Sequence, residues 1–430
     1  MPSSSAPTHS HAPAADAPPP TPEVLARRRR AVWLMLLVLV PVGLATVIGL
    51  VVLWPSGEPT RAEVAAEAFV PPGTTFPEAR VVSVEPFDCS LPGAPGQPSS
   101  ELTCARAVVE ITEGEGAGQF QQIELPAEVY AAGVEEGDVL VLTRDAGAEG
   151  GAGYQFYDYA RDLPIIVLAI AFAVVVAVVA RLRGLASLVG LAFAFFVLLQ
   201  FVLPGLLSDQ SPTLTSLVGS AAIMFVVLYL AHGFSARTTT ALVGTLFGLA
   251  LVAVMGAVSV EAARLTGLTS EETIQLQTFD PTLDFSGLVL AGIVVAGLGV
   301  LNDVTITQAS AIWQLHEVDP GLGWRQLYRR GMTVGRDHIA STVYTIVFAY
   351  AGAALPLLML FELYDQPIWT TLTSSALAEE VIRTLVGAIA LVLAVPVTTA
   401  AGAFFAIAAS GAAGAATERR MSALRARFAR

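Results

Sequence analysis

The amino-acid sequence predicts a polytopic α-helical membrane protein with about eight transmembrane helices and a small, barrel-like β-rich domain between the first and second helices. Hydrophobic residues make up 54% of the 430 residues and charged residues only 14%, whereas soluble domains carry about 25% charged residues. The apolar residues fall in separated blocks, each long enough to cross a bilayer core of about 30 Å. An acidic segment with strand-like patterning separates the first two blocks, which predicts a domain outside the membrane.

The N-terminal segment is rich in proline, alanine and serine and ends in four consecutive arginines, residues 27–30. Residues 1–30 have no apolar periodicity, so we expect a disordered cytoplasmic tail. A basic stretch before an apolar run is also typical of a cleaved signal peptide. The run at 31–54 exceeds twenty residues, however, and no clear cleavage site follows Trp54. We therefore expect an uncleaved signal-anchor helix.

Seven further apolar runs predict a transmembrane bundle over residues 163–409. They lie at 163–180, 185–203, 213–231, 238–260, 285–312, 338–361 and 384–409. With the N-terminus inside, 16 of the 23 arginines fall in cytoplasmic segments, as the positive-inside rule requires. We expect eight crossings of a bacterial inner membrane, with both termini and the basic tail at 410–430 in the cytoplasm.

The segment at 55–162 is acidic, with 19 carboxylates and five arginines and a local net charge of −14. Strand-like stretches at 79–84, 105–111, 120–125 and 137–142 are rich in β-branched residues or alternate polar with apolar. They predict a small antiparallel barrel, of the oligonucleotide/oligosaccharide-binding type. The acidity excludes nucleic acid as a partner, because nucleic-acid binding needs a basic face.

Two cysteines, Cys89 and Cys104, are the only ones in the chain, and both lie in this acidic segment. An extracytoplasmic location favours a disulfide between them, which would stabilise the fold by about 3 kcal/mol. The alternative is two unpaired thiols.

The most informative polar residues lie in the run at 285–312. Asp303 follows Leu288 by fifteen residues, which is about 22 Å along a helix and still within the membrane core. Asn302 precedes it, and Thr307 and Ser310 share its helical face. A carboxylate at this depth costs at least about 2.5 kcal/mol on insertion scales. We therefore expect Asp303 to face the interior of the bundle or a wet cavity.

The following run, at 338–361, carries a matching polar face. His338, Ser341 and Thr345 recur at spacings of three and four, and Tyr350 follows. The two runs are antiparallel neighbours. One interpretation is a relay for protons or a small cation, with Asp303 as the carrier. The other is a packing role, in which buried polar groups only bond neighbouring hydroxyls or cap a broken helix.

Other polar residues give weaker signals. Glu379, Glu380 and Arg383 open the last run, where acids suit the N-terminal end of the helix dipole, so we expect a capping role. The histidines and cysteines show no metal-ligand spacing, and no nucleotide-binding motif is present. We expect no enzymatic activity and no cofactor. The expected partners are the lipid bilayer, protons or a small cation, and another envelope protein or a second copy of the chain.

Three motifs carry a resemblance to a known family: GVLNDVTITQAS at 299–310, GRDHIAST at 335–342 and AYAG at 349–352. With the order of the elements, they resemble the YibE/F-like family of bacterial multi-pass membrane proteins, over about residues 70–410. The resemblance implies the membrane topology and no particular mechanism. Where the family pattern leads us to expect a second acid beside the core aspartate, this chain has Asn302, which leaves a single carboxylate.

Two functional hypotheses follow from the sequence. The first is an ion-coupled secondary transporter or export component with an intramembrane carboxylate. The second is a non-catalytic membrane scaffold whose extracytoplasmic domain binds an envelope partner.

Overall fold

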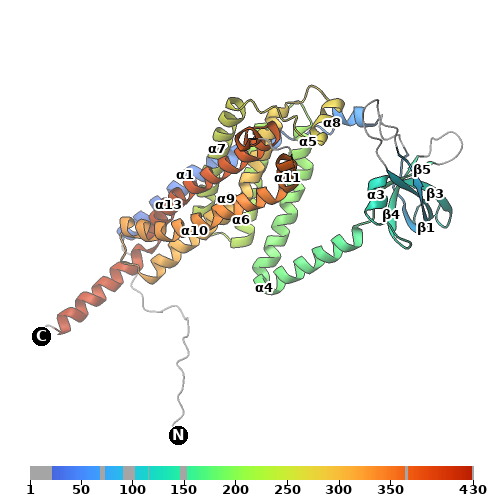
Figure 1. Ribbon diagram of the computed structural model, residues 1–430. Helices are drawn as coiled ribbons and strands as arrows, with labels where there is room; N and C mark the ends of the chain where they lie inside the picture. The colour runs from blue at the N-terminus through green and yellow to red at the C-terminus, as the bar shows by residue number, and fades with distance from the viewer. Residues whose placement is uncertain are drawn as a thin grey trace, which may run out of the picture. The chain divides into compact units, whose positions relative to one another are not determined.

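The computed structural model describes residues 22–67, 73–90, 102–114, 116–145, 153–363 and 367–428 (Figure 1). The chain forms two compact units, which we treat separately: the barrel unit, Pro59–Arg181, and the helical unit, Met1–Glu58 with Leu182–Arg430. Most of the disordered tail expected at 1–30 lies outside the described residues. Residues 22–30, however, are already helical, because Pro22 suits a first helical turn and good helix formers follow it.

The barrel unit is a five-stranded antiparallel sheet with the strand order β3-β2-β1-β4-β5. β3 also lies beside β5, so the sheet nearly closes into a barrel. The elements are α2 (Arg61–Glu67), β1 (Glu78–Asp88), β2 (Thr103–Ile111), β3 (Phe120–Leu125), α3 (Ala127–Ala131), β4 (Val139–Asp145) and β5 (Gly153–Tyr159). The expected barrel-like sheet is thereby confirmed.

Alternation along the strands forms the core of the barrel unit. Ala105, Ala107 and Val109 of β2 point inward and are fully buried, and they pack with Leu140 and Leu142 of β4. Small residues on β2 let the opposite walls approach closely. This period of two is the one on which the sequence prediction relied.

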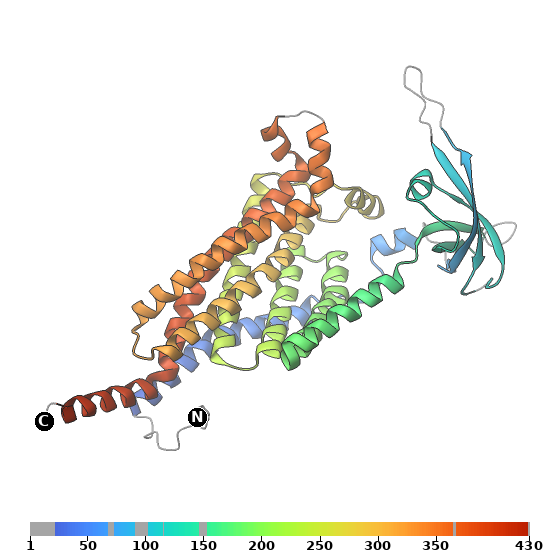
Figure 2. The same ribbon diagram turned by 60° about the horizontal axis from the view of Figure 1, so that its bottom comes forward.

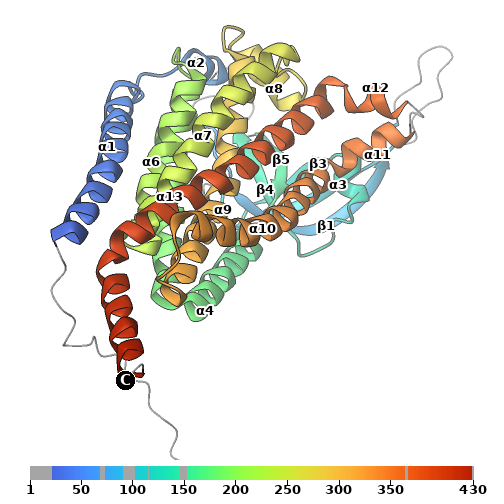
Figure 3. The ribbon, with the colours of Figure 1, turned by 90° about the vertical axis from the view of Figure 1, so that its left-hand side faces the viewer.

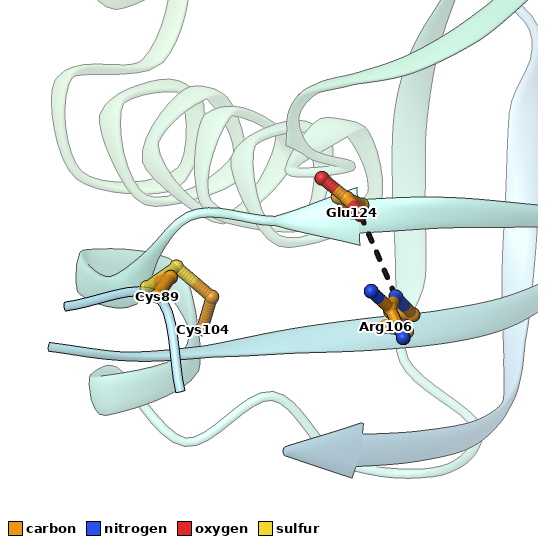
Figure 4. Close-up of polar contacts among 4 residues, drawn as sticks. All are labelled: Cys89, Cys104, Arg106 and Glu124. Atoms are coloured by element: carbon orange, nitrogen blue, oxygen red, sulfur yellow. Dashed lines mark hydrogen bonds and ion pairs between the residues drawn. A yellow bond between two sulfur atoms is a disulfide. The ribbon is translucent and has the colours of Figure 1, made fainter. Parts of the chain in front are cut away.

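A disulfide joins Cys89 to Cys104 at one end of the β1–β2 pair (Figure 4). Cys104 pairs with Phe87 in the ladder, so the bond closes the strand pair just beyond its last residues. Next to it, Arg106 forms an ion pair with Glu124 of β3 at 3.5 Å. Both of these side chains are exposed, so this ion pair adds little stability.

The helical unit consists of long apolar helices. They are α1 (Pro22–Val52), α6 (Pro212–His232), α7 (Ala236–Ala262), α9 (Phe285–Val318), α10 (Trp324–Ala353) and α13 (Ser375–Phe428), with the shorter α8 (Glu271–Phe279), α11 (Leu355–Leu363) and α12 (Ile368–Leu372). α4 (Asp162–Val197) continues through a π-helical turn, η1 (Leu198–Val202), into α5 (Leu203–Leu206), and it begins in the barrel unit.

Six helices of the described chain are long and apolar enough to cross a membrane. They are Val32–Val52, Asp162–Leu206, Pro212–His232, Ala236–Ala262, Phe285–Val318 and Ser375–Ala408. The bent pair α10–α11 makes a seventh if it counts as one span. These helices make the chain a multi-pass helical membrane protein. The sequence predicted eight segments, because it separated 163–180 from 185–203. In the structure these two runs are the two segments of α4, which meet at a kink where the backbone leaves helical geometry at Arg181 (φ 55°).

Three helices, α7, α9 and α13, form the centre of the helical unit, and α6 and α10 pack around them (Figure 2). Glycines permit the close approach of α7 and α9: Gly248 packs against Leu301, and Gly297 packs against Val252. Leu301 and Val252 are fully buried. Small residues at helix crossings are the usual means by which membrane helices pack closely.

The last helices extend further than the apolar runs predicted. α10 begins at Trp324 rather than at 338, because its Arg-rich first turns are helical although they are not apolar. It ends near Pro356, where α11 continues after a bend of 66°. α13 begins at Ser375 and runs through the basic tail as one helix (Figure 3). Apolar runs therefore mark the stretch that suits lipid rather than the ends of each helix.

Candidate functional site

The polar residues of α9 divide between two faces of the helix. Thr305 and Gln308 are almost completely buried, at 0% and 1% exposed, whereas Asp303 and Thr307 are exposed. Positions two residues apart on a helix lie about 200° apart around its axis, so Asp303 and Thr305 point in nearly opposite directions. We call the buried set the inner polar seam and the exposed set the outer polar face.

The inner polar seam ties the central helices together. The hydroxyls of Thr245 on α7 and Thr305 on α9 lie 2.6 Å apart. Each is also within hydrogen-bond distance of a backbone carbonyl oxygen of its own helix, Thr245 with Ala241 and Thr305 with Leu301. These side chains are satisfied and dry, and their arrangement serves helix packing.

Gln308 extends the seam to two further helices. Its side-chain amide donates to the carbonyl oxygen of Gly331 on α10 at 3.0 Å and to the hydroxyl of Thr399 on α13 at 2.7 Å. Thr399 in turn donates to the carbonyl oxygen of Val395. One neutral side chain thus connects α9, α10 and α13. The sequence analysis did not single out Thr305 or Gln308, although their position between Leu301 and Ile312 on the apolar face was the available signal.

The outer polar face carries Asp303 and Thr307 on α9. Within the described residues, Asp303 makes no hydrogen bond and no ion pair. The sequence-based expectation was that Asp303 faces the interior of the bundle or a wet cavity. In the structure its side chain is exposed, because the opposite side of α9 supplies the core contacts. Asn302 and Ser310 are half-buried, and the side-chain oxygen of Asn302 is buried without a hydrogen-bond partner among the described residues.

The helix contacts place His338 at about the same level as Asp303. Gln308 faces Gly331 and Gly335, and a short turn makes α10 antiparallel to α9. Asp303 is five residues before Gln308, about 7.5 Å along the axis. The same distance along α10 leads from the middle of the pair Gly331 and Gly335 to His338. The side chain of His338 is half-buried, and its Nε2 atom has no partner among the described residues.

The remaining predicted residues of α10 separate into two groups. Ser341 and Thr345 are exposed, and their hydroxyls donate to carbonyl oxygens of their own helix, those of Asp337 and Ser341. Tyr350 faces α13 instead, where it lines an apolar cavity of about 260 Å³ together with Leu377 and Glu380. The structure therefore places Ser341 and Thr345 on the exposed side of α10 and Tyr350 against α13.

The first turns of α13 hold a carboxylate whose burial the sequence analysis missed. Glu379 is buried, and its Oε2 accepts a hydrogen bond from the hydroxyl of Thr269 at 3.1 Å. Glu380 is ion-paired with Arg383 at 3.0 Å. The described part of the chain contains no cluster of three or more histidine, cysteine or acidic side chains that would hold a metal ion.

The fold and these two polar sets define a class: a multi-pass helical membrane protein with a β-barrel unit before its bundle and a carboxylate on a membrane-length helix. Residues 168–408, more than half of the chain, match the model of the family described as YibE/F-like protein, and the chain belongs to that family. The match begins within α4 and leaves the barrel out, although the sequence resemblance was expected from about residue 70. Neither the curated proteins nor the solved structures contain a match.

Proposed function

We propose that this protein crosses a bacterial inner membrane eight times with both termini in the cytoplasm. Met35 of α1 packs against Phe405 and Ala408 of α13, which supports a common side for the two chain ends. In the sequence, four arginines precede the first apolar run and five follow the last. The positive-inside rule assigns such an end to the cytoplasm.

The helix directions support an additional crossing between residues 59 and 181. Gly49 of α1 packs against Val218 of α6, near the end at which α6 starts, so these two helices are antiparallel. Gly190 packs against Val227, and Gly205 packs against Thr215, so the second half of α4 is also antiparallel to α6. Glu58 and Leu182 then belong to opposite membrane sides. The apolar stretch 162–180 is long enough to make the crossing.

We propose further that the protein is an ion-coupled secondary transporter or export component and that Asp303 is the coupling carboxylate. The observation that carries this proposal is the division of α9 into two faces. The neutral groups of the inner polar seam hold the helices together, whereas the Asp303 carboxylate has no partner among the described residues and lies on the exposed side. An ionisable residue at membrane depth indicates an ion or substrate path by default.

The second candidate is a scaffold that performs no transport and no catalysis. It is supported by the barrel unit, in which β1 pairs with both β2 and β4 and α3 lies between β3 and β4. This arrangement supports the oligonucleotide/oligosaccharide-binding type of barrel. An acidic barrel of this type suits an envelope protein as its partner rather than nucleic acid.

Proton flux in proteoliposomes tests the first candidate, with a trapped pH dye and an imposed ion gradient. We expect Asp303→Asn to abolish flux. Glu317→Gln removes an exposed carboxylate near the cytoplasmic end of the same helix and should keep it. Flux that survives Asp303→Asn would contradict the coupling role.

Deletion of residues 60–155 separates the two candidates. A transporter of the proposed kind should retain flux without its barrel, whereas a scaffold should lose its function. A wild-type protein without flux, together with capture of an envelope partner that requires the barrel, would favour the scaffold.

A further inference from the structure

Glu379, in the first turns of α13, is a carboxylate buried in apolar surroundings. Its side chain is buried, and the residue is only 8% exposed. The flanking Ala378 and Ile382 pack against an apolar cluster that includes Leu265 and Val386. With the orientation proposed above, this end of α13 faces the outside of the cell. A carboxylate here is close to the outer solution but shielded from it.

The two oxygens of this carboxyl group have different environments. Oε2 accepts a hydrogen bond from the hydroxyl of Thr269. Oε1 is buried and has no hydrogen-bond partner within the described chain. A charged oxygen in that position would be both desolvated and unpaired, which is costly. A protonated oxygen leaves no buried charge, and the geometry therefore favours the neutral carboxylic acid.

The neighbouring charges do not supply a counter-ion to Glu379. Two charged groups of opposite sign, Arg383 and Glu380, act electrostatically on Glu379. They are ion-paired with each other at 3.0 Å, so their effects oppose one another. The segment packed over Glu379 from the other side contributes two neutral donors, the hydroxyl of Thr269 and the backbone N–H of Gly267.

That segment is the loop at 263–270, between α7 and α8. It passes so close to α9 that a side chain at Gly267 would collide with the carbonyl oxygen of Phe285, and Gly267 has a positive φ of 72°. Thr269 is bonded to Glu379, and Ser270 caps α8 through its hydrogen bond to Thr273. The loop therefore covers Glu379.

We propose that Glu379 is a proton-binding site at the outer mouth of the helical unit and that the loop at 263–270 is its cover. In the covered state the carboxyl group keeps its proton. When the loop lifts, the Oε1–H bond breaks, the proton passes to water, and the carboxylate is stabilised by hydration. This inference deepens the proposed transport function, because coupled transport needs a group that exchanges ions with the outer solution. It does not depend on Asp303.

Hydrogen exchange of the full-length protein in lipid nanodiscs tests the proposal without any transport assay. In the wild type, protection of the loop amides, corrected for intrinsic rates, should fall as the pH rises and Glu379 ionises. If one ionisable group is linked to opening, protection should fall about tenfold per pH unit over the pH range in which opening of the loop releases the proton of Glu379. Glu379→Gln, which is neutral at every pH, should keep the protection constant. Glu362→Gln removes an exposed carboxylate of α11 and should retain the wild-type pH dependence.

Infrared spectroscopy of the same samples reports the proton directly. The band of a buried protonated carboxyl group should be present in the wild type and in Glu362→Gln, and absent from Glu379→Gln. Thr269→Val should lower the protection of the loop amides at all pH values and should leave the infrared band in place. The proposal is overturned if Glu379→Gln keeps the band or the pH dependence, or if the wild-type loop is insensitive to pH. A protein without ion flux could still pass this test, so the two proposals fail separately.

Discussion

The side-chain amide of Gln308 lies 2.7 Å from the hydroxyl of Thr399, in the buried interface between α9 and α13. The same amide bonds to the carbonyl oxygen of Gly331 on α10, so three helices meet at one neutral side chain. Lipid tails are as apolar as the helix surfaces, so the hydrophobic effect does little to drive helix association within the membrane. Close packing and hydrogen bonds of this kind must hold the helices together, which makes the inner polar seam a structural element.

Replacing Gln308 by leucine should destabilise the helical unit by about 0.5–2 kcal/mol, the range of interhelical hydrogen bonds in membranes. The loss is modest because Thr399 keeps its bond to Val395, so the substitution does not leave that hydroxyl unpaired. Unfolding of the purified protein in mixed detergent micelles measures it. In a double-mutant cycle, Thr399→Val should cost less in the Gln308→Leu background than in the wild type. Fully additive losses would contradict the shared bond.

Gly244→Ala should destabilise the protein by about 1–3 kcal/mol through overpacking. The new methyl group would collide with the hydroxyl of Thr398, which is fully buried and donates to the carbonyl oxygen of Ala394 at 2.8 Å. Gly387→Ala is the matched control, because no atom lies within 4 Å of its new methyl group. It should be neutral or stabilise α13 by up to about 1 kcal/mol. The same unfolding assay compares them, and equal effects would refute the proposed close contact.

The sequence predicted the class of the protein because apolar blocks and strand alternation are local patterns. The ends of the helices were less predictable. The first turns of α10 are helical although rich in arginine, and α4 is broken at Arg181 without a proline or glycine to announce it. A run of apolar residues indicates which part of the chain contacts lipid. Where the helix begins and ends depends on helix propensity, which is a weaker signal in the sequence.

The site was predicted only in part because side-chain orientation is a long-range property. α9 has polar residues on both faces, and the sequence alone favoured the face of Asp303 as the buried one. Because α7 and α13 pack on the opposite face, Thr305 and Gln308 are the buried polar residues instead. The burial of Glu379 depends likewise on Thr269, which lies 110 residues earlier. Neither contact can be predicted from the periodicity of apolar residues along one helix.

Removal of the disulfide should destabilise the barrel unit by about 3 kcal/mol, because the bond between Cys89 and Cys104 closes a loop with a separation of 15 residues. The double substitution Cys89→Ser and Cys104→Ser should lower the midpoint of thermal unfolding of the barrel. Limited proteolysis at increasing temperature measures this midpoint. A reductant should produce the same change in the wild type and none in the variant. A wild type that ignores the reductant while remaining accessible to it would count against this stabilising role.

The ion pair between Asp158 and Arg161 gives the barrel unit a pH dependence in the acid range. Arg161 donates to the Asp158 carboxylate at 2.6 Å, and this bond, with the backbone N–H of Tyr159, lowers the pKa of Asp158. A lowered pKa contributes stability above the ordinary aspartate range, and that contribution is lost as the pH falls through the lowered value. The contribution is small, because both side chains are exposed.

Arg161→Gln should therefore move the titration of Asp158 to higher pH, measured by carbon-13 NMR of protein labelled at its aspartate carboxyl groups. Arg106→Gln, which breaks the exposed pair with Glu124, should leave Asp158 unchanged. An Asp158 resonance that titrates at the same pH with and without Arg161 would exclude the ion pair as the cause.

The eight-crossing topology makes a prediction about two positions on either side of the stretch 162–180. The chain contains two cysteines, and the disulfide makes both unreactive, so introduced cysteines can be labelled singly. A membrane-impermeant maleimide should label Tyr157→Cys, an exposed position on β5, in cells whose outer membrane has been opened. Arg183→Cys should react only after the inner membrane is also permeabilised. The expected difference follows from the opposite sides to which the helix directions assign Glu58 and Leu182.

Two further positions calibrate that experiment. Glu271→Cys, at the start of α8, should react like Tyr157→Cys, and Ser235→Cys, between α6 and α7, should react like Arg183→Cys. Labelling of Arg183→Cys and Ser235→Cys, but not of Glu271→Cys, in unpermeabilised inner membranes would mean that 162–180 does not cross. The helical unit would then have an odd number of crossings, and its two ends, which Met35 and Phe405 bring together, could not share one side. The packing of α1 on α13 therefore makes the topology testable with one pair of residues.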